Sequence, residues 1–162
     1  MNPAAEYLDK IRNELGSSWL PQLYVQRVLK LRTRAYEFPP MPQNASPHIH
    51  HTLLGIELKA GRRRMLCPDL ATARYLSVFA RIGCRGVAIP YDITKISLIA
   101  DELDSSWHQM LLISARITAN RKAAFRARVR RRIIVKVRDE IAKAGAGPRV
   151  PEFKESPRER KL

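Results

Sequence analysis

The chain has 162 residues, of which 45% are hydrophobic and 28% are charged, a balance typical of one folded domain rather than of a disordered chain. Its 30 Lys and Arg residues outnumber 15 Asp and Glu residues, and the resulting net charge of +15 is unusual for an enzyme of small metabolites. No apolar run approaches the roughly 18 residues of a membrane-spanning helix, and the first residues lack the pattern of a signal peptide. We therefore expect a basic cytoplasmic protein without a transmembrane segment.

Two helices are predicted in the first part of the chain. A proline in the first turn and Gly16 as a stop signal predict a helix over residues 3–15. A second helix is expected to begin near Ser18, because apolar residues then recur at helical spacing, and to end before Pro39. Residues 39–51 contain four prolines, which forbid a regular helix and disfavour a central strand. This segment is predicted to be a Pro-rich connector.

The middle of the chain predicts a hairpin, a helix and a strand. Residues 52–58 and 63–67 are expected to be two strands joined by a turn in which Gly61 is free to adopt a positive φ. An amphipathic helix is predicted over about 70–82, followed by a short buried strand at 87–89. We expect these strands to form one small mixed sheet.

Two long helices are predicted in the last part of the chain. The first runs from Ile93 to about Ile117, with residues 104–106 as the place where it can break. The second spans about 120–144 and has a core stripe of six apolar residues, namely Phe125, Val129, Ile133, Ile134, Val137 and Ile141. Residues 148–162 are polar and contain proline, which is typical of a flexible tail.

Together these elements predict an α+β fold in a single, helix-rich domain of residues 1–147. A small mixed sheet is expected to be flanked by two N-terminal helices and two long C-terminal helices.

The positive charge is concentrated near the carboxyl end. Residues 119–138 contain nine basic side chains and no acidic one: Arg121, Lys122, Arg126, Arg128, Arg130, Arg131, Arg132, Lys136 and Arg138. A solvated helix usually gains stability from Glu and Lys at i,i+4 spacing, whereas this one leaves its charges uncompensated by sequence neighbours. Self-repulsion then costs stability unless a polyanion neutralises the helix.

Arginine outnumbers lysine in this run, and guanidinium groups suit phosphate oxygens. We therefore predict a non-catalytic protein that binds the phosphate backbone of RNA or DNA without a cofactor, helped by Arg62, Arg63 and Arg64. Three alternatives stay open: a solvated face whose acidic partners come from other helices, an anionic membrane surface, and an acidic protein or ribonucleoprotein complex on which the chain docks as an assembly or regulatory factor.

One short motif is compatible with catalysis. Glu57 and Lys59 are two residues apart on a predicted strand, so both side chains lie on the same face. A carboxylate that holds a divalent metal beside a lysine that orients the attacking water is the pair a metal-dependent phosphodiesterase needs.

The order of strand, basic turn, strand, helix and strand over residues 52–91 resembles the core of the PD-(D/E)xK nuclease superfamily, most closely its archaeal Holliday-junction resolvase branch. The resemblance assigns Glu57 and Lys59 to the family's ExK positions and implies a Mg²⁺ site and DNA cleavage. The sequence departs from the family on the preceding strand, where an Asp is required, because residues 38–56 contain neither Asp nor Glu.

A second metal-binding possibility lies in the connector. His48 and His50 share a face if this segment is extended, and neutral imidazoles bind transition metals. Because no Cys or carboxylate lies close by in sequence, a loop with polar rings is the competing interpretation.

Overall fold

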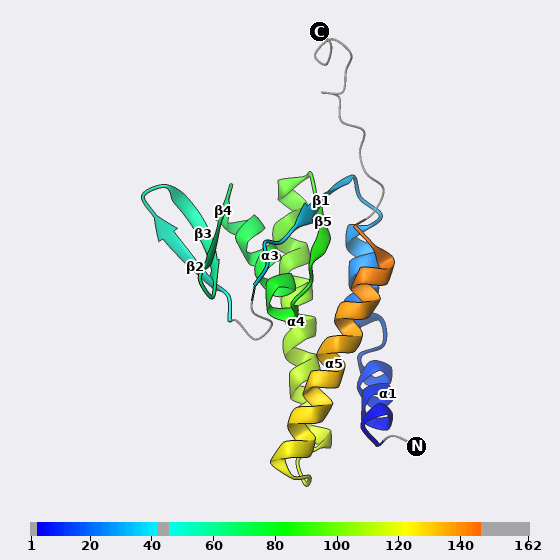
Figure 1. The fold of residues 1–162 in the computed structure, drawn as a ribbon. Coiled ribbons are helices and arrows are strands. Elements are labelled where there is room, and N and C mark those ends of the chain that lie inside the picture. The colour runs from blue at the N-terminus through cyan, green and yellow to red at the C-terminus, as the bar shows by residue number, and fades with distance from the viewer. Residues whose placement is uncertain (1–2, 42–45, 147–162) are drawn as a thin grey trace.

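The protein is described by a computed structural model over residues 3–41 and 46–146. It has the expected helix-rich α+β fold (Figure 1). Its helical elements are α1 (Pro3–Leu15), the 3-10 turn η1 (Gly16–Ser18), α2 (Leu20–Leu23), the π-helical turn η2 (Tyr24–Val28), α3 (Leu70–Ile82), α4 (Ile93–Ile117) and α5 (Ala123–Ala144). Its strands are β1 (Thr33–Glu37), β2 (His48–Thr52), β3 (Gly55–Ala60), β4 (Arg63–Cys67) and β5 (Gly86–Pro90).

The strands form two antiparallel sheets, so the expectation of one mixed sheet was wrong. Strands β2, β3 and β4 make a three-stranded sheet, and β5 pairs with β1 instead of joining the hairpin. The three-stranded sheet packs on α3, whereas α5 packs against α1 and α4. In Figure 1 the three-stranded sheet therefore lies at one edge of the molecule, and α1 and α5 lie at the opposite edge.

The predicted second helix ends earlier than its apolar spacing suggested. Helical backbone stops at Val28, and residues 33–37 become β1. The physical reason is β5, which is buried over residues 87–90 and whose backbone groups need partners. Residues 33–37 supply those partners, with Thr33 opposite Pro90 and Glu37 opposite Gly86.

The Pro-rich connector also contains regular structure that the sequence analysis missed. Strand β2 occupies residues 48–52, where it pairs with β3. All four prolines of the connector precede this strand, so they do not interrupt its hydrogen bonding. The predicted tail, residues 148–162, lies outside the described residues.

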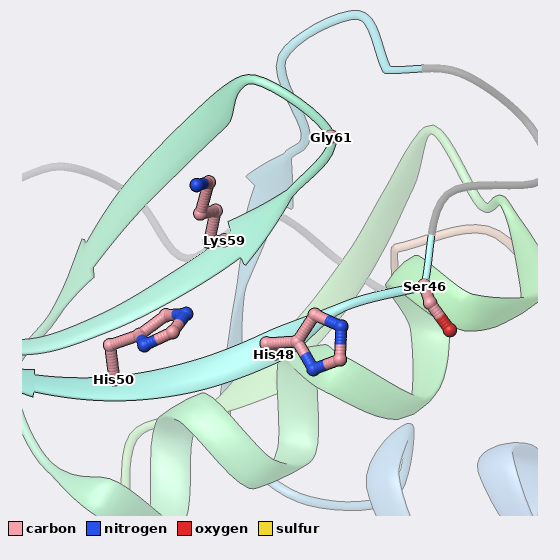
Figure 2. A pocket seen from close by; sticks show the side chains of 5 residues that line it. All are labelled: Ser46, His48, His50, Lys59 and Gly61. Atoms are coloured by element: carbon pink, nitrogen blue, oxygen red, sulfur yellow. The ribbon is translucent and has the colours of Figure 1, made fainter.

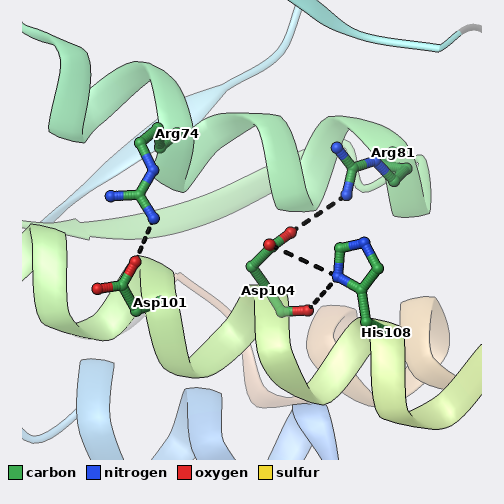
Figure 3. A network of polar contacts seen from close by, with 5 residues as sticks. All are labelled: Arg74, Arg81, Asp101, Asp104 and His108. Atoms are coloured by element: carbon green, nitrogen blue, oxygen red, sulfur yellow. Dashed lines mark hydrogen bonds and ion pairs between the residues drawn. The ribbon is translucent and has the colours of Figure 1, made fainter.

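Helix α4 runs without a break through residues 104–106. The Ser106 hydroxyl donates a 2.6 Å hydrogen bond to the Ser18 carbonyl, so a residue expected to weaken the helix instead fastens it to η1. The Asp104 carboxylate forms an ion pair with the Arg81 guanidinium of α3, with 3.3 Å between nitrogen and oxygen. It also contacts the His108 ring one helical turn further along α4 (Figure 3). In the described part of the chain, no helix is long and apolar enough to cross a membrane.

Buried Tyr24 ties three separate segments together. Its hydroxyl donates a 2.7 Å hydrogen bond to the carbonyl of Gly145, at the end of α5, and accepts a 2.8 Å bond from the amide of Ala88 in β5. Burial raises the pKa of Tyr24 from 10.0 to about 12, although the bond from Ala88 lowers it. The end of α5 is thereby held to the two-stranded sheet.

We expect Tyr24→Phe to lower the free energy of unfolding by about 1–3 kcal/mol, because it leaves the Gly145 carbonyl and the Ala88 amide without this partner. Urea denaturation measures the loss. Tyr91→Phe is the matched control, since the Tyr91 ring is exposed, and it should change stability by less than about 0.5 kcal/mol.

The pH dependence provides an independent check of the same interaction. Because the folded state holds the Tyr24 proton more tightly than the unfolded chain, this contribution is fully present below pH 10 and is lost as the pH rises through about 12. The stability of Tyr24→Phe should therefore fall less steeply over that range. Equal slopes for variant and parent would contradict the assignment.

Candidate nucleic-acid interface

A single buried stripe fixes the orientation of α5. Val129, Ile133, Val137 and Ile141 are at most 1% exposed, and each follows the last by four residues. Phe125 and Ile134, which the sequence also assigned to the core, are half-buried beside this stripe. The other faces of the helix must therefore point away from the core.

The carboxyl half of α5 is anchored by polar contacts as well. Glu140 accepts a 2.7 Å hydrogen bond from the Trp19 indole and a 3.0 Å ion pair from Arg12 of α1. These bonds lie on the same side as the contact between α5 and α1, so the helix is held against rotation about its axis.

The basic side chains of α5 form two rows on either side of the buried stripe. Because residues four apart stack along a helix, the first row is Lys122, Arg126 and Arg130, and the second is Arg128, Arg132 and Lys136. Arg131 lies on the outer face between the rows. All seven side chains are exposed. We call these seven residues the α5 basic surface.

The rows place like charges next to each other along the helix. Three pairs of basic residues within α5 stand at i,i+4 spacing: 126 with 130, 128 with 132, and 132 with 136. Each such pair destabilises an exposed helix by about 0.2–0.5 kcal/mol at low salt. The helix keeps these charges although each pair costs stability.

Four acidic residues of the described chain pair with arginines outside α5. Ion pairs join Arg27 to Glu102, Arg74 to Asp101, Arg81 to Asp104, and Arg116 to Glu14. Within residues 3–41 and 46–146, Arg126, Arg128, Arg130, Arg131 and Arg132 have no ion-pair partner at all. In the described chain, therefore, no other helix supplies an acidic partner to these five arginines.

The amino end of α5 adds to the positive field. Asp69 caps α3 by accepting a bond from Thr72, and Asp92 caps α4 through Thr94, whose hydroxyl and amide lower the pKa of the Asp92 carboxyl. By contrast, α5 has Lys122 at its N-cap, no acidic residue in its first turn and no side-chain cap. The positive end of the helix dipole and the basic side chains therefore reinforce each other.

An aromatic cluster that the sequence analysis missed supports this end. Tyr7 of α1 and Phe125 of α5 pack edge to face with ring centroids 5.5 Å apart. Arg121 lies 4.0 Å from the Phe125 centroid and donates a 3.1 Å hydrogen bond to the Tyr7 hydroxyl, while Arg128 lies 5.8 Å from the same phenyl ring. The contact joins residues 118 positions apart in the chain, so no pattern in the local sequence predicts it. It orders two arginines without neutralising them.

Two predicted binding residues contact other groups of the same chain. Arg138 is half-buried, donates a 3.2 Å bond to the Ile82 carbonyl at the end of α3, and lies over Gly83. Burial raises the pKa of the neighbouring Cys84 thiol to about 12, although Arg138 lowers it. Lys136 contacts Glu140 at 3.6 Å, so it is the least available member of the α5 basic surface.

The predicted auxiliary arginines belong to the three-stranded sheet and not to the α5 basic surface. Arg62, Arg63 and Arg64 lie at the β3–β4 turn and are exposed. Arg63 donates a 3.1 Å hydrogen bond to the Pro40 carbonyl, whereas Arg64 pairs in register with Lys59. The structure thus separates the predicted basic residues into two groups at opposite edges of the molecule (Figure 1).

Glu57 and Lys59 do share one face of β3, as the strand spacing predicted. Their cross-strand neighbours on β2 are His50 and His48, respectively. His48, His50 and Lys59 project to the same side of the sheet (Figure 2). Among the described residues, no three His, Cys, Asp or Glu side chains come together to hold a metal ion. The predicted Mg²⁺ and histidine metal sites therefore gain no further ligand from the fold.

Comparison with known proteins found no match to a protein-family model, a curated protein or a solved structure. The resemblance of residues 52–91 to a nuclease core stays a prediction that rests on the sequence.

We expect Arg132→Glu to raise the free energy of unfolding by about 1–2 kcal/mol at low salt, because it turns two repulsive i,i+4 pairs, with Arg128 and Lys136, into attractive ones. Urea denaturation measures the gain, which should shrink at high salt. Arg27→Glu is the matched control and should destabilise the fold, because it places a carboxylate against Glu102. A loss of stability in Arg132→Glu would contradict the claim that Arg132 is repelled by Arg128 and Lys136.

The nuclease prediction has a direct test. If Glu57 holds a catalytic Mg²⁺, the protein cleaves branched DNA in Mg²⁺, and Glu57→Ala lowers the rate by at least a hundredfold. A gel assay with labelled four-way junctions measures cleavage. Equal cleavage by Glu57→Ala and parent protein would rule out this role for Glu57.

Proposed function

We propose that the protein binds the phosphate backbone of RNA or DNA through the α5 basic surface, without itself catalysing a reaction. The observation that carries the proposal is a group of five exposed arginines, at 126, 128, 130, 131 and 132, that have no acidic partner in the described chain. Repulsion among these like charges destabilises the folded protein, and a bound polyanion removes that repulsion.

The chemistry of the surface favours phosphate over other anions. Five of the seven residues of the α5 basic surface are arginines, and the planar guanidinium group donates two parallel hydrogen bonds to phosphate oxygens. Neutralising a nucleic-acid backbone also releases condensed counterions, which supplies most of the affinity of such contacts. The rows on either flank of α5 give the helix two lines of donors along which a backbone can run.

The proposal includes a cytoplasmic location. It is supported by Cys67 and Cys84, which are both buried and unpaired, as expected of a protein kept in a reducing compartment.

An acidic protein or ribonucleoprotein partner is the competing interpretation, because carboxylates also attract arginine. Purification with and without nuclease distinguishes the two. Under our proposal, nucleic acid copurifies with the parent protein and nuclease removes the bound material. A partner protein retained after nuclease treatment would favour the docking alternative.

We expect the triple variant Arg128→Glu, Arg131→Glu and Arg132→Glu to abolish binding of a labelled oligonucleotide in fluorescence anisotropy. The parent should show a steep linear fall of log K with log salt, and any residual binding by the variant should have a slope about 3 units shallower, roughly one unit for each lost phosphate contact.

The matched control is Arg32→Glu, Arg34→Glu and Lys95→Glu, which alters net charge by the same amount at exposed positions in α4, in β1 and just before β1. This control should keep most of the affinity. Equal loss in both triple variants would show that net charge alone matters, and an affinity independent of salt in the parent would contradict backbone binding.

A further inference from the structure

The outward face of the three-stranded sheet carries a second group of side chains with no role in the core. Alternate residues of β3 and β4 pack inward on α3, including Leu58 and Met65. The residues between them point away from the core. In register, one outward row across the three strands is His48, Lys59 and Arg64, and the next is His50, Glu57 and Leu66.

This face is open and lined by rings and cations. His48 and His50 are exposed, and their ring centroids lie 6.4 Å apart. Together with Lys59 and Gly61 they border a hollow of about 620 Å³ (Figure 2). That volume falls in the range of about 300–1,000 Å³ of small-ligand pockets, so it can accept one base with its sugar.

The charges on this face select an anion over a metal ion. Lys59 stands opposite His48 in the sheet, and Arg64 stands opposite Lys59, so a cation bound by the histidines would meet two positive side chains. Glu57 is the only acidic residue on the two outward rows, and it lies opposite His50. Phosphate therefore fits best at the His48–Lys59–Arg64 row, away from Glu57.

The rings and exposed apolar surface favour an unpaired base beside that phosphate. Imidazole rings on an open sheet face are stacking partners for bases that are not already stacked in a duplex. Leu66, on the second outward row, is 65% exposed and adds apolar surface next to Glu57, on the side away from His50. An acidic peptide would use the two cations and the imidazole N–H donors, but it would leave the ring faces and Leu66 without a stacking partner.

We propose that this outward sheet face binds a single-stranded segment of nucleic acid, with bases stacked on His48 and His50 and phosphates held by Lys59 and Arg64. The inference rests on the proposed function and assigns its substrate class: a nucleic acid with an unpaired segment. In this arrangement α5 holds the backbone of either single or double strands, and the sheet face adds affinity only for unpaired nucleotides.

The experiment compares a labelled single-stranded 20-mer of deoxythymidine with a 20-base-pair duplex at the same salt concentration. The parent protein should prefer the single strand. His48→Ala with His50→Ala should weaken single-strand binding by about tenfold or more, since stacking contributes about 1–3 kcal/mol per base, and should leave duplex binding unchanged. Lys59→Ala with Arg64→Ala should reduce the salt slope for the single strand by about 1.4, since each phosphate contact on a single strand contributes about 0.7.

His51→Ala is the matched control. It removes the same ring from the same strand, but strand alternation places His51 on the opposite face, and it is also exposed. Single-strand affinity should be unchanged in this variant, and thermal unfolding should confirm that each variant is folded.

The failure of this inference is distinguishable from failure of the proposed function. If the His48 and His50 variant keeps its single-strand affinity, or if His51→Ala loses as much, the sheet-face site is overturned while duplex binding through α5 stands. If polyglutamate competes for the face and its binding is lost in the same variant, the ligand is an acidic peptide and the inference is also overturned. If the parent binds neither oligonucleotide, the proposed function itself fails.

Discussion

The orientation of α5 is the constraint on which the rest of the structure depends. Four aliphatic side chains at four-residue spacing give the helix a narrow apolar stripe, and burying that stripe leaves the opposite face and its basic flanks in solvent. Glu140 and the Tyr24–Gly145 hydrogen bond then hold the carboxyl half in place. Once the stripe is buried, the arginines between residues 126 and 132 are exposed to solvent. In the described residues they form no ion pair with an acidic side chain.

The contrast with α3 and α4 makes this distribution of charge informative. Between those helices, Arg74 and Arg81 are matched by Asp101 and Asp104, so the chain does pair its arginines where two helices pack (Figure 3). The five arginines of the α5 basic surface have no such partner in the described residues, and only its Lys136 contacts a carboxylate, that of Glu140. Together with the sheet face at the opposite edge, it gives the molecule two cationic surfaces that differ in kind: one is a helix that suits a phosphate backbone, and the other is a sheet with exposed rings.

Local signals in the sequence were sufficient for α1, α3 and α5, because stop signals and apolar periodicity depend on residues close in the chain. They were insufficient for β1, whose partner β5 lies about fifty residues away and whose own sequence continues the helical spacing of residues 20–31. Strand β2 was missed because the prolines before it dominated the composition. For the candidate site, the basic run and its exposure followed from the sequence, but the Tyr7–Phe125 contact and the inward turn of Arg138 required the packed fold.

The central claim is that the exposed arginines of α5 meet a polyanion. The most direct measurement is a residue-by-residue map of the backbone amide resonances by NMR, recorded as a short oligonucleotide is added. We expect the largest and earliest shifts over residues 121–132, reversed by added salt, with little change along the face of α4 that α3 covers. Saturable binding with shifts confined to other elements, leaving residues 121–132 unmoved, would contradict the account.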